Sequence, residues 1–260
     1  MSILSQLQWS IQQRGLTGTF TMAAKSLGRR LRPQPERPPH PFDLAHGTDT
    51  GGLISGASLS SGHPSDVFIS GYAGVPPSRL LNILNRWQAS NPPHPLSEYT
   101  FVDLGCGKGR AVLLASQLGF RESIGVELNP TLAATARSNA ERWIAANLAR
   151  SPIRIEQQDA AEFAWPSGPT LIFLFNPFSA PVLERVATSL LTHFRDRPAD
   201  LELLYYKPEQ AAALHAFQKI WSEPIAISPE DLAADPVADP NDLTQAYRLK
   251  TLETRTHPTV

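Results

Sequence analysis

The sequence contains a single cysteine, Cys106, among its 260 residues, so an internal disulfide is excluded. One lone cysteine is typical of a protein kept in a reducing compartment. No apolar run is long enough to span a bilayer. The first thirty residues also lack the basic, then apolar, then small order of a secretory signal. We therefore expect a cytoplasmic protein without a transmembrane segment.

Several catalytic patterns are also missing. The seven histidines show no metal-ligand spacing, and with one cysteine available this argues against a zinc site. A GxxxxGK[ST] sequence is absent, which excludes a P-loop. Cys106 has no accompanying His and Asn constellation, so we do not expect it to be a nucleophile. We predict no metal site.

Net charge is nearly absent overall, at −1, which gives no strong signal for nucleic-acid binding. The charge is uneven, however: residues 1–40 carry about +5 and the remainder about −6. A basic arm over residues 1–37 can contact an acidic partner or a membrane surface. Solvated helix faces have the same composition, and this plainer interpretation is the favoured one.

Proline and glycine divide the chain into three parts. Residues 1–41 predict a basic helical extension, with two helices within 2–31 followed by a proline-rich, extended linker. Residues 42–75 are rich in glycine and poor in aromatic residues, so they cannot build their own core. We expect this segment to wrap the main domain and to border its cleft. Residues 76–260 form the main domain.

Strands and helices alternate in the main domain. Helices are predicted over 77–89, 108–118, 130–148, 181–194 and 209–217, and strands over 99–104, 123–127, 153–158, 170–175 and 201–206. The stretches 224–228 and 244–250 predict a terminal hairpin, with 233–240 as a loop. Such alternation predicts an α/β fold with a doubly wound, mostly parallel sheet. Ligands of these sheets bind beyond the carboxyl ends of the strands.

The first of these strands ends in an acid and a glycine turn. Asp103 closes the strand, and Gly105, Gly107 and Gly109 follow at alternate positions. Arg110 stands where a dinucleotide-binding fingerprint needs its third glycine for helix packing. The carboxylate of Asp103, placed beside a cleft, suits an ammonium group. A nicotinamide-dependent oxidoreductase remains an alternative that this spacing disfavours.

Acids also follow the next two strands. Glu127 can accept hydrogen bonds from both hydroxyls of a ribose, although a helix N-terminus also attracts an acid. Asp159 can accept from the exocyclic amine of an adenine, or it can cap a turn. With Asp103 upstream, the nucleotide interpretation is favoured for both.

The apolar strand 170–175 ends in Asn176, Pro177 and Phe178. The amide oxygen of Asn176 and the carbonyl oxygen of Pro177 form an acceptor pair able to orient an amine, and Phe178 can exclude water. An Asn-Pro pair is also common in turns. Tyr205 and Tyr206 end the next strand, where one can line the substrate side while the other points into the core.

Together these residues resemble the class I S-adenosylmethionine-dependent methyltransferases, over roughly residues 72–250. The resemblance implies a Rossmann-like seven-stranded sheet of order 3-2-1-4-5-7-6, with strand 7 antiparallel. It implies that Asp103 and the backbone of Gly105, Cys106, Gly107 and Gly109 hold the methionine moiety of the cofactor. It further implies that Glu127 holds the ribose and that Asp159 and Ala160 meet the adenine.

The pattern is most similar to a bacterial group distantly related to the non-SET lysine methyltransferases that modify histones. Phe42-Asp43 and Gly47-x-Asp49-Thr50-x-Gly52 resemble that group too. Asn176-Pro177-Phe178 lacks the second proline of the Asn/Asp-Pro-Pro-Tyr/Phe motif. That motif belongs to enzymes methylating adenine N6 or a glutamine amide, so these two acceptors are disfavoured.

We therefore predict transfer of a methyl group from S-adenosylmethionine to an amine nitrogen of a protein lysine or a small molecule, leaving S-adenosylhomocysteine. Asn176, Pro177 and Phe178 are the predicted catalytic residues. Tyr72 and Asn176 are further predicted cofactor contacts, with Asp49 and Tyr72 in a segment that closes over the cofactor. No residue stands out as a general base. A non-catalytic protein that binds S-adenosylmethionine is a further alternative.

Overall fold

The computed structural model describes residues 39–235 and 237–249. The chain divides into a unit of residues Met1–Pro38 and a unit of Pro39–Val260, and the described residues belong to the second. The helices predicted within 2–31, the basic arm and most of the predicted linker lie outside the described residues. The predicted division at residues 41 and 75 remains a prediction.

The centre of the described unit is a seven-stranded sheet of order β5-β4-β3-β6-β7-β9-β8. Its strands are β3 (Thr100–Leu104), β4 (Glu122–Glu127), β5 (Ile153–Gln157), β6 (Thr170–Phe175), β7 (Leu201–Tyr206), β8 (Phe217–Pro224) and β9 (Leu243–Leu249). The first five run parallel, whereas β9 is antiparallel to both β7 and β8. Numbered within the sheet this order is 3-2-1-4-5-7-6, so the predicted fold class and topology are confirmed.

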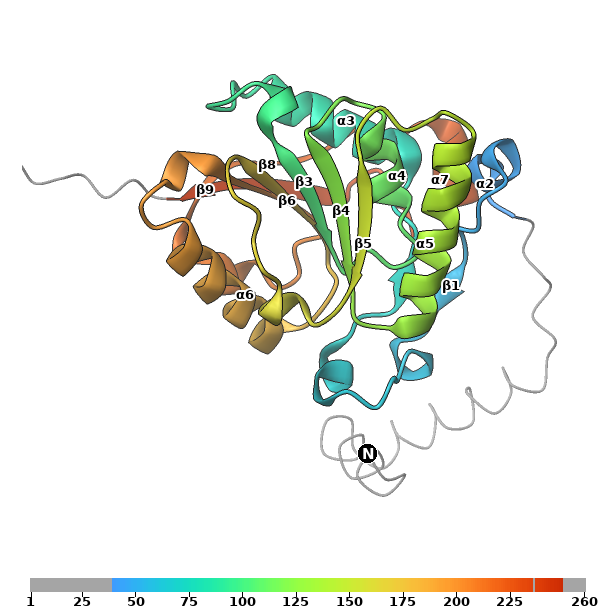
Figure 1. Cartoon of the computed structure of the whole chain (residues 1–260), viewed down its shortest axis with the longest axis horizontal. Helices are drawn as coiled ribbons and strands as arrows, with labels where there is room; N and C mark the ends of the chain where they lie inside the picture. The colour runs from blue at the N-terminus through green and yellow to red at the C-terminus, as the bar shows by residue number, and fades with distance from the viewer. Residues whose placement is uncertain (1–38, 236, 250–260) are drawn as a thin grey trace, which may run out of the picture. The chain divides into compact units, whose positions relative to one another are not determined.

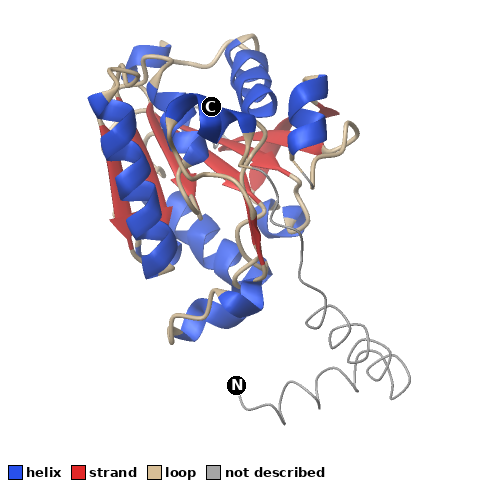
Figure 2. Cartoon of the chain, turned by 90° about the vertical axis from the view of Figure 1, so that its right-hand side faces the viewer, coloured by secondary structure: helices blue, strands red, loops and turns tan. Residues whose placement is uncertain are grey.

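Helices cover both faces of the sheet (Figures 1 and 2). They are α3 (Pro77–Gln88), α4 (Arg110–Ser116), α5 (Pro130–Ala145), α6 (Ala180–His193) and the short α7 (Pro229–Ala234). One apolar cluster joins α6 to one face of the sheet, and a second joins α3, α4 and α5 to the other. This three-layer arrangement is the expected outcome of crossover connections between parallel strands.

The alternation of side chains along β3 determines the face of the sheet on which Asp103 lies. Val102 and Leu104 point into the cluster beside α6, and Phe101 points into the cluster beside α3 and α4. Because side chains alternate along a strand, Asp103 shares the face of Phe101. It therefore reaches the carboxyl end of the sheet beside α4 and the glycine turn that precedes this helix.

Two predictions at the carboxyl-terminal end are wrong. Residues 209–217 were expected to form a helix, but only a single 3-10 turn forms at Ala211–Leu214, and β8 begins at Phe217. The first hairpin strand was expected at 224–228 and lies instead at Phe217–Pro224. Phe217 and Trp221 are buried in the two apolar clusters, so packing against the sheet selects an extended chain here.

The segment before α3 is more ordered than its composition predicts. Pro41 does not extend the linker but begins the helix α2 (Pro41–His46), because proline is tolerated at a first helical position. The segment then forms a small hairpin of β1 (Leu53–Ile54) and β2 (Tyr72–Ala73), with two 3-10 turns between them. The Phe42 ring packs on Trp143 of α5 at 5.5 Å between ring centroids, which holds α2 against the main domain.

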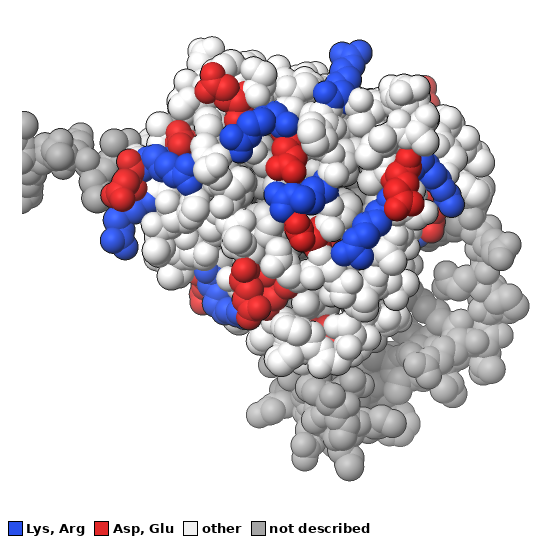
Figure 3. All heavy atoms as spheres, in the orientation of Figure 1, with Lys and Arg blue, Asp and Glu red and all other residues white. Residues whose placement is uncertain are grey.

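Residues 233–240 were predicted to form a loop, but the first two of them, Ala233 and Ala234, belong to the end of α7. Within residues 39–235 and 237–249, no helix has the length and apolar character needed to cross a membrane. On the face drawn in Figure 3, basic and acidic side chains lie interspersed over the described surface.

Candidate functional site

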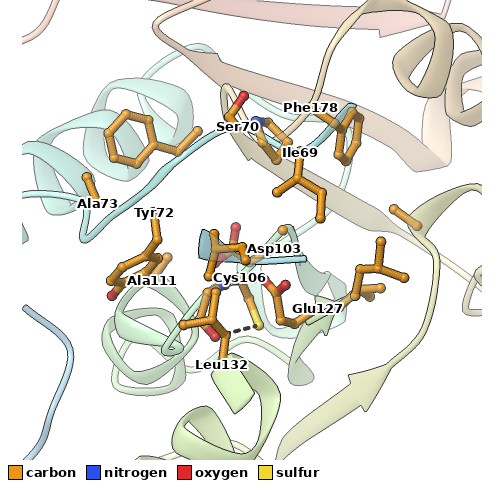
Figure 4. Close-up of a pocket in the computed structure, with 18 of the residues that line it drawn as sticks. Ile69, Ser70, Tyr72, Ala73, Asp103, Cys106, Ala111, Glu127, Leu132 and Phe178 are labelled. Carbon is orange, nitrogen blue, oxygen red and sulfur yellow. Dashed lines mark hydrogen bonds between the residues drawn. The ribbon is translucent and has the colours of Figure 1, made fainter. Parts of the chain in front are cut away.

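A pocket opens at the carboxyl ends of β3, β4 and β6, where parallel sheets place their ligand sites. Its walls come from the glycine turn, from the strand ends and from the segment between η1 (Gly56–Ser58) and α3. Figure 4 shows Asp103, Cys106 and Glu127 grouped on one side, with Ile69, Ser70 and Phe178 on another. Of the predicted site residues, the lining includes Tyr72, Asp103, Gly105, Cys106, Gly107, Glu127, Asp159, Ala160, Pro177 and Phe178.

The turn after β3 needs its glycines for both conformation and space. Gly105 and Gly107 have φ values of +75° and +55°, which side chains rarely adopt. A Cβ atom on Gly105 would lie 2.4 Å from Pro177, and one on Gly107 would lie 2.1 Å from the Tyr72 ring. The N–H groups of Gly105 and Cys106 both donate to the Val126 carbonyl oxygen, which fixes the turn against β4.

Asp103 is buried, with 4% of its surface exposed. Its carboxylate receives no hydrogen bond from the described part of the chain. Burial raises its pKa to about 8, and the nearby charge of Glu127 adds to this effect. Among the described residues, no cation therefore stabilises the ionised form of this acid.

Glu127, at the end of β4, is held by the backbone instead. The N–H of Gly107 donates to Oε2 and the N–H of Asn129 donates to Oε1, each at 2.8 Å. Burial raises the pKa of Glu127, and these two hydrogen bonds oppose the rise. The carboxylate links the glycine turn to the start of α5, and each oxygen keeps a lone pair for a ligand hydroxyl.

Asp159 also caps a turn, as its plainer interpretation expected. Its Oδ1 accepts from the Ala161 N–H at 2.9 Å, at the start of a 3-10 turn over Ala160–Glu162. Its Oδ2 accepts from the Ser65 hydroxyl at 2.8 Å. Asp159 therefore ties the segment before α3 to the third strand end while still facing the pocket.

The turn after β6 differs from its expected arrangement. Asn176 adopts a φ of +42° and is not among the residues lining the pocket. Its Oδ1 accepts from the Tyr205 hydroxyl at 3.1 Å, and that hydroxyl accepts from the Gln210 N–H at 3.2 Å. The Pro177 carbonyl oxygen already accepts from the Ser70 N–H at 3.1 Å. Both predicted acceptor atoms thus have one partner and one free lone pair each.

Neither tyrosine at the end of β7 lines the pocket, and both are fully buried. Burial raises the pKa of Tyr205 to about 12, so its hydroxyl stays protonated near neutral pH. Tyr206 points to the other face of β7 and donates to Asp242 at 2.8 Å. The substrate-lining role expected for one of them is therefore not seen, although Tyr205 contacts Asn176.

Two further predicted residues behave differently from each other. Tyr72 lines the pocket and donates its hydroxyl to the Thr50 carbonyl oxygen at 2.6 Å. Asp49 lies outside the lining and pairs with Lys108 on the surface at 2.6 Å. Burial raises the pKa of Cys106, which favours the protonated thiol.

Sequence reasoning missed several wall residues between η1 and α3. They include Leu59, Ser65, Ile69, Ser70 and Val75. Ile69 and Phe178 form an isolated antiparallel β-bridge, and the Ser179 N–H donates to the Phe68 carbonyl oxygen. These contacts join residues more than one hundred positions apart, and the segment has no periodicity that would signal them.

Residues 102–169 match the family model described as a methyltransferase domain. This range runs from β3 to the residue before β6 and so contains the glycine turn, Glu127 and Asp159. The match and the strand order support the predicted enzyme, an S-adenosylmethionine-dependent methyltransferase. The predicted enzyme class and cofactor are confirmed. The match argues against the alternative of a nicotinamide-dependent oxidoreductase.

Among curated proteins, the chain is similar to the adenine nucleotide translocase lysine N-methyltransferase of Mus musculus, with 56% identity over 41 residues. That stretch is 16% of this chain, and the chain spans only 18% of the length of that relative.

Among solved structures, it is similar to an RNA methyltransferase from Salinibacter ruber bound to S-adenosyl-L-homocysteine, at 16% identity and a TM-score of 0.38. That likeness covers 67% of this chain and 93% of the other. The glycopeptide N-methyltransferase MtfA bound to S-adenosylmethionine is 13% identical with a TM-score of 0.46, covering 67% and 94%.

Proposed function

We propose that the protein transfers the methyl group of S-adenosylmethionine to an amine nitrogen, on a protein lysine or a small molecule. The observation that carries the choice of acceptor is the 41-residue stretch that is 56% identical to a lysine N-methyltransferase. The missing second proline after Asn176 supports it, since the motif of adenine and glutamine methylation is incomplete.

The proposed cofactor contacts follow the charges of the pocket. Asp103 pairs with the ammonium group of the methionine moiety, because its buried carboxylate has no cation in the described chain. The backbone of the glycine turn surrounds the same moiety. Glu127 accepts from the ribose hydroxyls through its free lone pairs. Asp159 and Ala160 contact the adenine, and Tyr72 covers the cofactor over Gly107.

The proposed transfer site is the turn after β6. The amine lies against the free lone pairs of Asn176 Oδ1 and the Pro177 carbonyl oxygen, with Phe178 excluding water. Tyr205 holds the amide of Asn176, since its hydroxyl already accepts from Gln210 and must donate its proton to Asn176.

The chemistry is an in-line displacement: the nitrogen lone pair forms a bond to the methyl carbon as the bond from carbon to sulfonium breaks. The donor already carries the driving force, so the protein contributes mainly alignment and water exclusion. These terms can together be worth about 7–11 kcal/mol. An ammonium acceptor must first lose a proton. Tyr205 cannot take it because it is protonated, and we propose that solvent does.

The experiment is a transfer survey with S-adenosylmethionine labelled on the methyl group, using fractionated lysate and free amines, followed by mass spectrometry of the product. We expect label on an amine nitrogen. Asn176→Ala should retain S-adenosylhomocysteine affinity while turnover falls by about 100-fold, the scale of a misplaced reactant. Label on oxygen or carbon would contradict the proposed acceptor, and unchanged turnover would reduce Asn176 to a turn residue.

A further inference from the structure

A buried guanidinium stands at the start of α4, directly after the glycine turn. Arg110 is 2% exposed, and it contacts three segments that are far apart in the sequence. Its Nε donates to Thr50 Oγ1 at 2.8 Å, and one terminal nitrogen donates to the Val75 carbonyl oxygen at 3.1 Å and to Asp235 at 3.2 Å. Asp43 lies 3.9 Å from the other terminal nitrogen.

Thr50 is the residue through which this cluster reaches the pocket. It is fully buried, and its N–H and hydroxyl donate to Asp43 Oδ1 at 2.8 and 2.6 Å. With Arg110 donating to the same hydroxyl, both polar side-chain functions of Thr50 are satisfied and its position is fixed. Its carbonyl oxygen is then free to accept from the Tyr72 hydroxyl at 2.6 Å.

Tyr72 in turn lies on the glycine turn. A Cβ atom on Gly107 would fall 2.1 Å from the Tyr72 ring, which shows how closely the ring rests there. The ring also borders the pocket beside Asp103 and Cys106 (Figure 4). Space is equally tight at Gly74, where a Cβ atom would lie 2.7 Å from both the Arg110 Cζ and the Thr50 carbonyl oxygen.

We propose that Arg110 and Thr50 are positioning residues for methyl transfer, which place Tyr72 over the cofactor. The chain of contacts runs from Arg110 through the Thr50 hydroxyl, to the Thr50 carbonyl and then to the Tyr72 hydroxyl. Arg110, which stands in place of the third glycine of a dinucleotide fingerprint, thus has a proposed role. It connects the cofactor turn to the segment that covers it. This inference rests on the proposed placement of the cofactor beside Gly107.

The test is a double-mutant cycle on S-adenosylhomocysteine affinity, measured by calorimetry on the full chain. Tyr72→Phe removes the hydroxyl but keeps the ring, and Thr50→Val removes the hydroxyl that Arg110 and Asp43 use. Each is expected to weaken binding by about tenfold, the worth of one well-placed hydrogen bond. The double variant should also lose only about tenfold, because both changes break one chain of contacts.

Two controls separate positioning from general damage. Thr50→Ser keeps the hydroxyl and should bind within about twofold of the unaltered chain. Arg248→Met on β9 breaks a partly buried ion pair with Glu202 of β7, and should lower thermal stability without changing affinity. Should Thr50→Val not fold, Arg110→Lys replaces it in the cycle, because a lysine cannot reach Thr50 and Val75 with a planar fork.

An additive loss near 100-fold in the double variant, or unchanged affinity in Thr50→Val, would overturn the inference. An unaltered chain that does not bind S-adenosylhomocysteine would instead contradict the proposed cofactor site, before any variant is compared. The two failures are therefore distinguishable.

Discussion

Asp103, Asp43 and Asp235 are all buried carboxylates, but within residues 39–235 and 237–249 only Asp43 and Asp235 have a cation nearby. Asp43 and Asp235 lie 3.9 and 3.2 Å from the Arg110 guanidinium, and Asp235 also pairs with His40 at 3.1 Å. For Asp103, burial raises the pKa to about 8, and the like charge of Glu127 adds to this rise.

A buried charge destabilises a protein unless it is paired and hydrogen-bonded. Around Arg110 both carboxylates have a cation inside the chain, although only Asp235 is hydrogen-bonded to it and one terminal nitrogen of Arg110 makes no hydrogen bond. We therefore expect these carboxylates to stabilise the fold. At Asp103 no cation of the described residues meets this requirement, and we propose that a ligand supplies the cation. We therefore assign a structural role to Asp43 and Asp235 and a ligand-binding role to Asp103, and the predictions below test this assignment.

The largest expected effect is the loss of stability when the cation of Asp43 and Asp235 is removed. Arg110→Met leaves Asp43 and Asp235 buried without their cation, and should lower the free energy of unfolding by about 3–5 kcal/mol. Urea denaturation measures this. Lys108→Met is the matched control, because it removes an ion pair with the exposed Asp49 and should cost no more than about 1 kcal/mol. Equal losses in the two variants would contradict the structural role of the Arg110 cluster.

Substitution of the unpaired Asp103 should have the opposite effect, with stability kept and ligand affinity lost. Asp103→Asn removes an uncompensated acid, so the free energy of unfolding at pH 8 should stay the same or rise. Affinity for S-adenosylhomocysteine should fall by about 100-fold, because a buried charge pair with the ligand ammonium is lost. Calorimetry checks the affinity and urea denaturation the stability. A variant that is less stable and binds as well as before would show that Asp103 has a structural role and does not bind the ligand.

The pH dependence of stability sharpens the same contrast. The pKa of Asp103 is 3.8 unperturbed and about 8 when folded, so between these values the folded chain holds a proton that the unfolded chain has lost. The free energy of unfolding contributed by this residue should therefore be greatest below pH 4 and fall as the pH rises to about 8. Asp103→Asn should flatten this part of the profile. An unchanged slope would show that Asp103 does not titrate in this range.

A smaller effect is expected at the turn after β6. Tyr205→Phe removes the hydrogen bond that orients the Asn176 amide, and should lower kcat by about tenfold. Cofactor affinity should not change, since Tyr205 does not line the pocket. Steady-state kinetics with the labelled donor measures both. Weaker cofactor binding in this variant would place Tyr205 with the cofactor instead of the acceptor.

Regular elements were predictable because their signals are local. The apolar runs Thr170–Phe175 and Leu201–Tyr206 form strands with the predicted bounds. Asn129 caps α5, with its side chain accepting from two backbone N–H groups, and an Asn before a Pro is itself a local signal for a helix start. Residues 209–217 carried helical spacing, but the burial of Phe217 against the sheet decided their conformation.

The site was predictable only where it follows the strand ends. Asp103, Glu127 and Asp159 converge because parallel strands end at one edge of the sheet. The Arg110 cluster was not predictable, because Asp43 and Asp235 meet only through tertiary packing of α2 and α7. The departure from the glycine fingerprint at position 110 was its one signal. The contact of Asn176 with Tyr205 depends on a positive φ, which the sequence does not display.

Proton release on ligand binding tests the central claim most directly, that the cation of the cofactor meets an unpaired Asp103. Calorimetry of S-adenosylhomocysteine binding at pH 7, in two buffers of different ionisation enthalpy, gives the number of protons released. Because the pKa of free Asp103 is about 8 and the ligand ammonium requires its ionised form, the account predicts release of close to one proton. Affinity should rise about tenfold per pH unit up to that pH. Binding without proton release, and with affinity independent of pH between 6 and 8, would contradict it.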